Sequence, residues 1–142
     1  METNPQLELA RKFVLNTGRN VFLTGKAGTG KTTFLQQLRE SAAKRMVVVA
    51  PTGVAAINAR GVTIHSFFQL PPTLQIGIDR IKPENFRFGK EKRNIIRSLD
   101  LLVIDEISMV RADLLDAIDL VLRRNRSNNR PFGGVQLLMI GD

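Results

Sequence analysis

The sequence contains no cysteine, which excludes disulfide bonds and metal sites built from thiolates. A chain without cysteines suits a reducing compartment, so we expect a cytoplasmic protein. No apolar run approaches the roughly 18 residues that cross a bilayer. Residues 1–5 also lack the basic and apolar regions of a signal peptide. The sequence therefore predicts no membrane segment.

Acidic residues are scarce, since 13 Asp and Glu stand against 21 Lys and Arg, a net charge of +8 over 142 residues. The excess lies in two stretches. Residues 80–97 hold seven basic and two acidic residues, and residues 123–130 hold four arginines and no acid. Clustered positive charge indicates a polyanion partner, although two solvated helix faces would give the same pattern. The length and the 43% of hydrophobic residues predict one globular domain over residues 1–142.

Residues 25–32 fit the phosphate-binding pattern of Gly, four residues, Gly, Lys and Thr. Glycines let the backbone turn tightly and point its N–H groups at a phosphate, and the helix that follows adds its positive end. The lysine would contact the β- and γ-phosphates of ATP, and the threonine hydroxyl would complete a Mg²⁺ shell. A chance glycine-rich turn is the alternative. The predicted nucleotide-binding residues are Gly25, Lys26, Ala27, Gly28, Thr29, Gly30, Lys31, Thr32 and Thr33.

A second chemical signature follows an apolar run at residues 101–104. Such a run predicts a buried strand, and Asp105 and Glu106 would then stand at its carboxyl end, where α/β sheets bind ligands. Asp105 is predicted to hold Mg²⁺ opposite Thr32, and Glu106 to orient and deprotonate the attacking water. An Asp-Glu pair that merely opens a surface loop is the alternative.

The other elements follow from periodicity and caps. We expect a helix from Pro5, capped by Asn4, ended by Gly18 and buried along Leu9, Ala10, Phe13 and Val14. Strands are expected at 21–24, 46–50, 62–64, 101–105 and 135–140. Helices are expected after the loop at 25–32 (Phe34, Leu35, Leu38, Ala42), after Thr52 (Val54, Ile57, Ala59), at 89–98 (Ile95, Ile96, Leu99) and at 113–126 (Leu114, Leu115, Ile118, Val121, Leu122). Residues 69–88 are expected to form an irregular insertion.

These motifs together resemble the Pif-type (petite integration frequency) DNA helicases, relatives of RecD in superfamily one. The resembling segments are 25–32, 50–56, 61–67, 105–110, 131–134 and 141–142. The resemblance implies a three-layer α/β P-loop NTPase fold of RecA type, with a mainly parallel sheet flanked by helices and incomplete at its C-terminus. It also implies that the strand at 135–140 lies between those at 21–24 and 101–105, with 46–50 beyond 101–105.

The resemblance also assigns roles. Lys31, Asp105 and Glu106 would be catalytic, and Gln6 would read the adenine, unless it is a surface residue. A single-stranded DNA path would be lined by Pro51, Thr52, Gly53, His65, Ser66 and Phe67. Phe67 or Phe68 could instead pack inside, and the lone His65 could be structural. Gln69-Leu70-Pro71-Pro72 looks like a later motif of the family but stands before the Asp-Glu strand, so we give it no role.

Two functions are compatible with these features. The first is the ATPase motor of a DNA helicase used in DNA repair or recombination, whose second motor domain and γ-phosphate arginines the resemblance places outside these residues. The second is a P-loop nucleotide-binding module or switch without motor activity. Stimulation of ATP turnover by single-stranded DNA would separate them.

Overall fold

A computed structural model describes residues 5–24, 30–41, 43–71 and 88–141. Its centre is a parallel sheet of five strands in the order β1-β5-β4-β2-β3. The strands are β1 (Val21–Thr24), β2 (Met46–Ala50), β3 (Val62–Thr63), β4 (Leu101–Ile104) and β5 (Gln136–Gly141). Strand β5 lies between β1 and β4, and β2 lies beyond β4, so the predicted strand order is confirmed.

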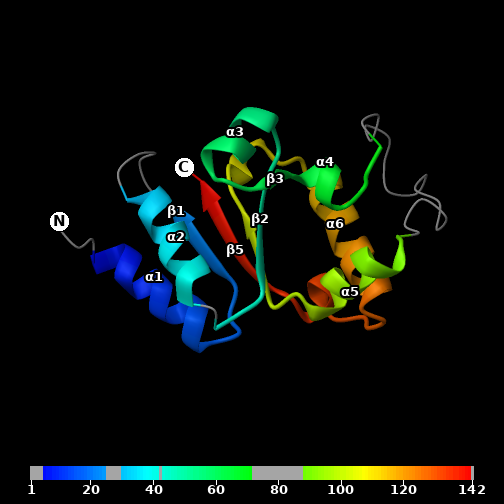
Figure 1. The fold of residues 1–142 in the computed structure, drawn as a ribbon, viewed down its shortest axis with the longest axis horizontal. Helices are drawn as coiled ribbons and strands as arrows, with labels where there is room; N and C mark the ends of the chain where they lie inside the picture. The colour runs from blue at the N-terminus through cyan, green and yellow to red at the C-terminus, as the bar shows by residue number, and fades with distance from the viewer. Residues whose placement is uncertain (1–4, 25–29, 42, 72–87, 142) are drawn as a thin grey trace.

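Helices cover both faces of this sheet (Figure 1). One face carries α1 (Pro5–Asn16) and α2 (Lys31–Ser41), and the other carries α4 (Ile64–Phe67), α5 (Lys90–Ser98) and α6 (Ala112–Asn125). Helix α3 (Gly53–Asn58) and the short 3-10 helices η3 (Ile107–Met109) and η4 (Pro131–Gly134) complete the described elements. Because side chains alternate along a strand, Leu101 and Val103 enter the α1–α2 core, whereas Leu102 and Ile104 enter the α5–α6 core.

Local sequence signals account for several of these elements. All four residues of β4 are buried, as the continuous apolar run predicted. The Thr52 side chain accepts a hydrogen bond of 3.2 Å from the backbone N–H of Ala55, so it caps α3 as expected. Thr63 caps α4 in the same way through the N–H of Ser66 at 3.1 Å, which turns the predicted extended Ile64 into the first residue of a helix.

Several predicted core residues are instead exposed. In α1 the buried side chains are Ala10 and Val14, while Leu9 and Phe13 face outward. In α3, Val54 and Ile57 are 72% and 77% exposed, and the small Ala56 and Ala59 are buried. Ile95 of α5 is exposed, whereas Ile96 and Leu99 are buried as predicted. In α3 the small alanines allow close approach to the sheet, and this decided its inward face more than hydrophobicity did.

The end of α1 also differs from the prediction, because it is held by a lysine side chain and not by a glycine conformation. Gly18 does not adopt the left-handed conformation that a glycine stop uses. The Lys44 ammonium instead donates to the carbonyl oxygens of Val14 and Thr17 and to the Gln136 side chain. A cation on the last carbonyls of a helix satisfies their unmet hydrogen bonds and complements the helix dipole. Burial lowers the pKa of this lysine.

The Asn4 cap, Ala42 and most of the 69–88 insertion lie outside the described residues. Within the described ranges, no helix combines the length and the hydropathy needed to cross a membrane.

Gly61 provides a test of the packing between α3 and β2. A Cβ at this position would stand 2.3 Å from the carbonyl oxygen of Val48, and backbone atoms cannot move aside cheaply. We expect Gly61→Ala to lower the free energy of unfolding by about 1–3 kcal/mol in urea denaturation. Gly18→Ala is the control, because a Cβ there meets no atom within 4 Å, and its effect should stay within about 0.5 kcal/mol. Equal effects of the two substitutions would contradict this packing.

Candidate nucleotide site and DNA path

The carboxyl ends of the five parallel strands meet at one edge of the sheet, where most of the predicted site residues lie. Residues 25–29 of the phosphate-binding loop are outside the described part of the chain, and Gly30 leads into α2, which begins with the motif residues Lys31 and Thr32. Gly30 has a φ of 106°, and a Cβ there would come 2.9 Å from Leu7 Cδ1. The positive φ favours glycine at this fixed position of the motif.

Lys31 and Asp105 form the central ion pair of the site. The Lys31 Nζ lies 3.1 Å and 3.3 Å from the two carboxylate oxygens of Asp105. The Asp105 side chain is only 2% exposed, and that of Lys31 is 25% exposed. A carboxylate buried this deeply needs a cation beside it. The pair therefore holds the first turn of α2 against the end of β4.

Glu106 stands next to this pair with its Oε1 3.8 Å from the Lys31 Nζ. Its backbone is left-handed, with φ 55° and ψ 48°, a conformation that costs a non-glycine residue about 1–3 kcal/mol and that clusters at functional sites. The chain packs closely directly after Glu106, since a Cβ on Gly141 would come 2.8 Å from Ile107 Cγ2. Sequence patterns gave no sign of this conformation or of the packing between β5 and η3.

The oxygen donors at this edge fit a magnesium ion. Mg²⁺ usually takes one or two carboxylates and completes its shell with waters and substrate phosphates. The Asp105 carboxylate and the Thr32 hydroxyl, the two predicted ligands, would supply such an incomplete set. Thr32 is the second residue of α2, directly after the lysine that contacts Asp105. Thr33 follows it and is exposed.

The position of its neighbour Leu7 places Gln6 close to the carboxyl edge of the sheet. It is the second residue of α1, and the adjacent Leu7 contacts the position where a Gly30 side chain would begin. The start of α1 is thus next to the end of the phosphate-binding loop. Its predicted contact with adenine stays a prediction.

The residues predicted to line a DNA path form two neighbouring segments. Pro51, Thr52 and Gly53 follow the carboxyl end of β2, and His65 and Ser66 belong to α4, directly after β3. Strands β2 and β3 pair side by side, so both segments lie at the same edge of the sheet. Thr52 and His65 are half-buried, and Gly53 and Ser66 are exposed.

Phe67 does not present its ring to solvent in this structure. It is 7% exposed, its ring packs edge-on against that of Phe68 with centroids 4.9 Å apart, and the Lys92 ammonium sits 4.0 Å from the ring centre. Both adjacent phenylalanines are buried, whereas only one was expected to be. The stacking of Phe67 on a base stays a prediction that this packing does not favour.

A double-mutant cycle tests the central ion pair. Lys31→Ala leaves the buried Asp105 carboxylate without its cation, so we expect the nucleotide-free chain to lose about 1–3 kcal/mol of unfolding free energy. Adding Asp105→Asn should restore part of this loss, since the buried group is then neutral. Urea denaturation measures both, with exposed Lys12→Ala as control. Strictly additive effects would show that the pair has no energetic coupling.

Known proteins match this chain over nearly its whole length. The family model described as PIF1-like helicase matches residues 6–142. The ATP-dependent DNA helicase PIF1 of Emericella nidulans is 39% identical over 92% of this chain and 18% of its own length. The human ATP-dependent DNA helicase PIF1 is 38% identical over 99% of this chain and 22% of its own length. The chain thus spans about a fifth of these relatives.

Solved structures give the same result. A crystal structure of Bacteroides Pif1 bound to ssDNA superimposes with a TM-score of 0.87 and 46% identity, over 100% of this chain and 32% of that chain. The Bacteroides sp Pif1 in complex with ADP-AlF4 gives a TM-score of 0.88 at the same identity and coverage. The order of the motifs, the strand order and the matched family model agree, and the chain belongs to the PIF1-like helicase family.

Proposed function

We propose that residues 1–142 form one RecA-like domain, the N-terminal part of the first motor domain of an ATP-dependent DNA helicase. The observation that carries this proposal is the Lys31–Asp105 pair at the carboxyl edge of the sheet, with Glu106 beside it. Family membership adds support, because the similar proteins are named ATP-dependent DNA helicases. A cytoplasmic location is part of the proposal.

The nucleotide chemistry follows from the charges at this edge. Lys31 turns from Asp105 to the β- and γ-phosphates of ATP when nucleotide enters the loop. The Asp105 carboxylate and the Thr32 hydroxyl would hold Mg²⁺, which would supply positive charge to the phosphate oxygens. Glu106 orients the attacking water and accepts its proton, a role that suits a carboxylate that is 37% exposed and fixed by a strained backbone.

Single-stranded DNA is the proposed substrate of the neighbouring segments. The backbone N–H groups of Thr52 and Gly53 and the hydroxyls of Thr52 and Ser66 suit phosphate oxygens. The DNA-bound structure of the similar Bacteroides Pif1 supports this assignment. Coupling of ATP turnover to movement requires a second motor domain that closes over the nucleotide, and we propose that this domain is the partner of the present one in the full-length helicase.

Titration with a fluorescent ATP analogue tests the nucleotide site. Lys31→Ala should weaken binding at least tenfold, about 1.4 kcal/mol, because the charge facing the phosphates is removed. Glu106→Gln should bind nearly as wild type, because it changes water activation and not the phosphate contacts. Chelation of Mg²⁺ should weaken binding to both wild type and Glu106→Gln. Equal affinity of wild type and Lys31→Ala would refute the site.

Binding of a fluorescent oligothymidine tests the DNA path. The double variant His65→Ala with Ser66→Ala removes two polar side chains of α4 and should weaken this binding about tenfold, with affinity for ATP unchanged. Gln37→Ala, on the exposed side of α2, is the control and should bind like wild type. A chain that binds ATP but no single strand at low salt would instead be a nucleotide-binding module without motor activity.

A further inference from the structure

The two basic stretches of the sequence meet in the structure, although 25 residues separate them. Helix α5 packs against α6. The Arg97 Nε donates to the carbonyl of Asn125 at 3.1 Å, and the Arg126 Nη1 donates to the carbonyls of Ile96 and Leu99 at 2.8 and 3.0 Å. Positive charge from both stretches therefore gathers at one place.

Some of these basic side chains are occupied inside the protein. Lys92 lies over the Phe67 ring. Arg123 pairs with Asp119 at 2.8 Å. The Arg126 guanidinium donates hydrogen bonds to carbonyl oxygens of α5 and of Gly133. These three side chains hold the fold and are unsuited to a partner.

Four of the other cations form what we call the basic stripe, defined as Lys90, Arg93, Arg97 and Arg124. At about 100° per residue, the three side chains on α5 lie within roughly 60° of one another around the helix. Glu91, the acidic residue of α5, points to another side. All four members are exposed, and Arg93 and Arg124 have no ion-pair partner among the described residues. Arg97 links the two helices, because it bonds to the residue after Arg124.

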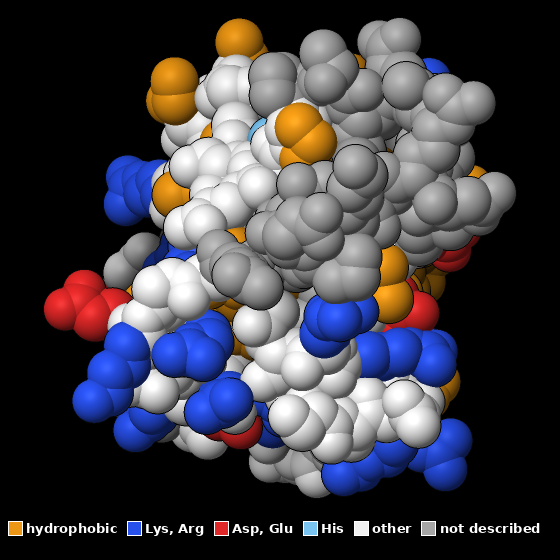
Figure 2. Space-filling model, turned by 90° about the vertical axis from the view of Figure 1, so that its right-hand side faces the viewer, with side chains coloured by type: hydrophobic (Ala, Val, Ile, Leu, Met, Phe, Trp, Pro, Cys, Tyr) orange, Lys and Arg blue, Asp and Glu red, His pale blue; other side chains and the backbone are white. Residues whose placement is uncertain are grey.

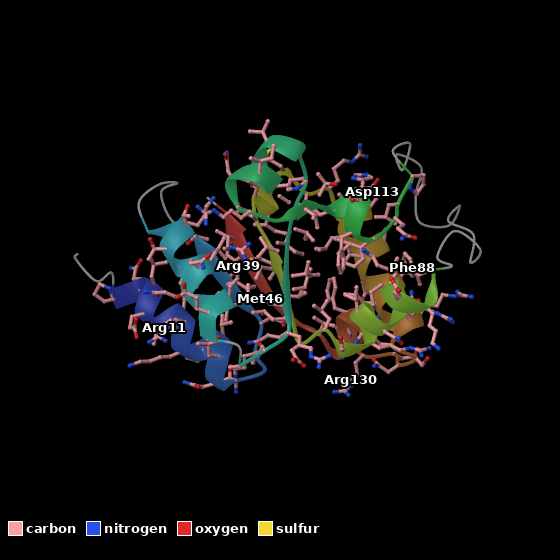
Figure 3. The ribbon with its side chains drawn as sticks, viewed as in Figure 1. Arg11, Arg39, Met46, Phe88, Asp113 and Arg130 are labelled. Carbon is pink, nitrogen blue, oxygen red and sulfur yellow. The ribbon has the colours of Figure 1, made fainter. Side chains whose placement is uncertain are left out.

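The stripe lies away from the nucleotide site, and the α5 side chain that contacts Phe67 of the predicted DNA path is Lys92, which is not a member of the stripe. Helix α5 leads into the amino end of β4, and α6 ends just before η4 and the amino end of β5. Figure 3 shows this polarity, with Asp113 near one end of α6 and Arg130 at the opposite end of the molecule. Lysines and arginines gather over the lower half of the face in Figure 2. The stripe therefore faces a partner other than the single-stranded DNA that we propose runs along Pro51–Gly53 and Ser66.

We propose that the basic stripe binds the phosphate backbone of double-stranded DNA. Surfaces for single strands combine cations with aromatic rings on which bases stack, and neither α5 nor α6 contains an aromatic residue. A duplex needs no such rings, and it presents about one phosphate charge per 1.7 Å of axis. The eight residues from Lys90 to Arg97 extend about 10 Å along α5, so several phosphates lie within reach at once.

This inference goes beyond the proposed motor function and does not depend on it. The stripe shares no residue with the nucleotide site or with the DNA path. Lys31→Ala should leave duplex binding unchanged, so failure of one proposal is visible separately from failure of the other.

The test measures anisotropy of a labelled blunt 20-base-pair duplex with the 142-residue chain. The variant R93Q/R124Q removes two stripe charges, and K12Q/R19Q removes two exposed charges elsewhere, so both have a net charge of +6 instead of +8. We expect R93Q/R124Q to bind the duplex about tenfold more weakly at 0.1 M salt. Its slope of log affinity against log salt should fall by about 1.8, or 0.9 per phosphate contact.

The controls define what would overturn the proposal. K12Q/R19Q and the charge-keeping R93K/R124K should bind the duplex within twofold of wild type, and R93Q/R124Q should bind oligothymidine within twofold. Equal loss in both glutamine doubles would mean binding by net charge alone. If R93Q/R124Q lost affinity equally for the duplex and for oligothymidine, the stripe would be part of the single-stranded DNA path. If R93Q/R124Q lost binding to phosphatidylserine vesicles but kept its duplex binding, the stripe would be a membrane-binding surface instead. If R93Q/R124Q melts early, K90Q/R93Q on α5 replaces it, with the same outcomes.

Discussion

The buried carboxylate of Asp105 is the constraint on which the site depends. The four apolar residues of β4 carry this charge to a position where it is almost without solvent, and a charge there is tolerated only beside a cation. Lys31 supplies that cation and thereby fixes α2 against the sheet. When phosphates draw Lys31 away, Asp105 needs a new positive partner at once. Nucleotide and Mg²⁺ are therefore expected to arrive together, because the cost of an unpaired Asp105 links the two.

The insertion of β5 between β1 and β4 also shapes the carboxyl edge of the sheet near Glu106. It brings Gly141 beneath η3, where only a glycine leaves room for Ile107. That packing holds the chain directly after Glu106 and stabilises its left-handed backbone. The Glu106 carboxylate, which we propose activates water, thus lies beside the end of a strand that is 35 residues further along the sequence.

The sequence predicted the elements with strong local signals and missed what depends on tertiary packing. Continuous apolar runs identified β2 and β4, Thr52 identified the start of α3, and the family resemblance supplied the strand order. Periodicity placed Ala59 inward correctly but could not show that Ala56 would face the sheet in place of Val54 and Ile57, because it measures hydrophobicity and not the space available. Contacts such as Lys44 on the end of α1 join distant residues, and no local pattern contains them.

Basic residues show why charge alone was an ambiguous signal. The same arginine-rich segment supplies Arg126, which ties α6 to α5, and Arg124, which faces solvent. Only the second kind contributes to a surface for phosphates. The stripe and the nucleotide site lie toward opposite ends of the strands, and the four residues of β4 alone extend about 13 Å. At physiological ionic strength the Debye length is about 8 Å, so charges at one end are largely screened from the other. Electrostatic attraction of DNA to the stripe should therefore leave the affinity of the nucleotide site unchanged, and any coupling between the two sites must pass through movement of the helices and strands.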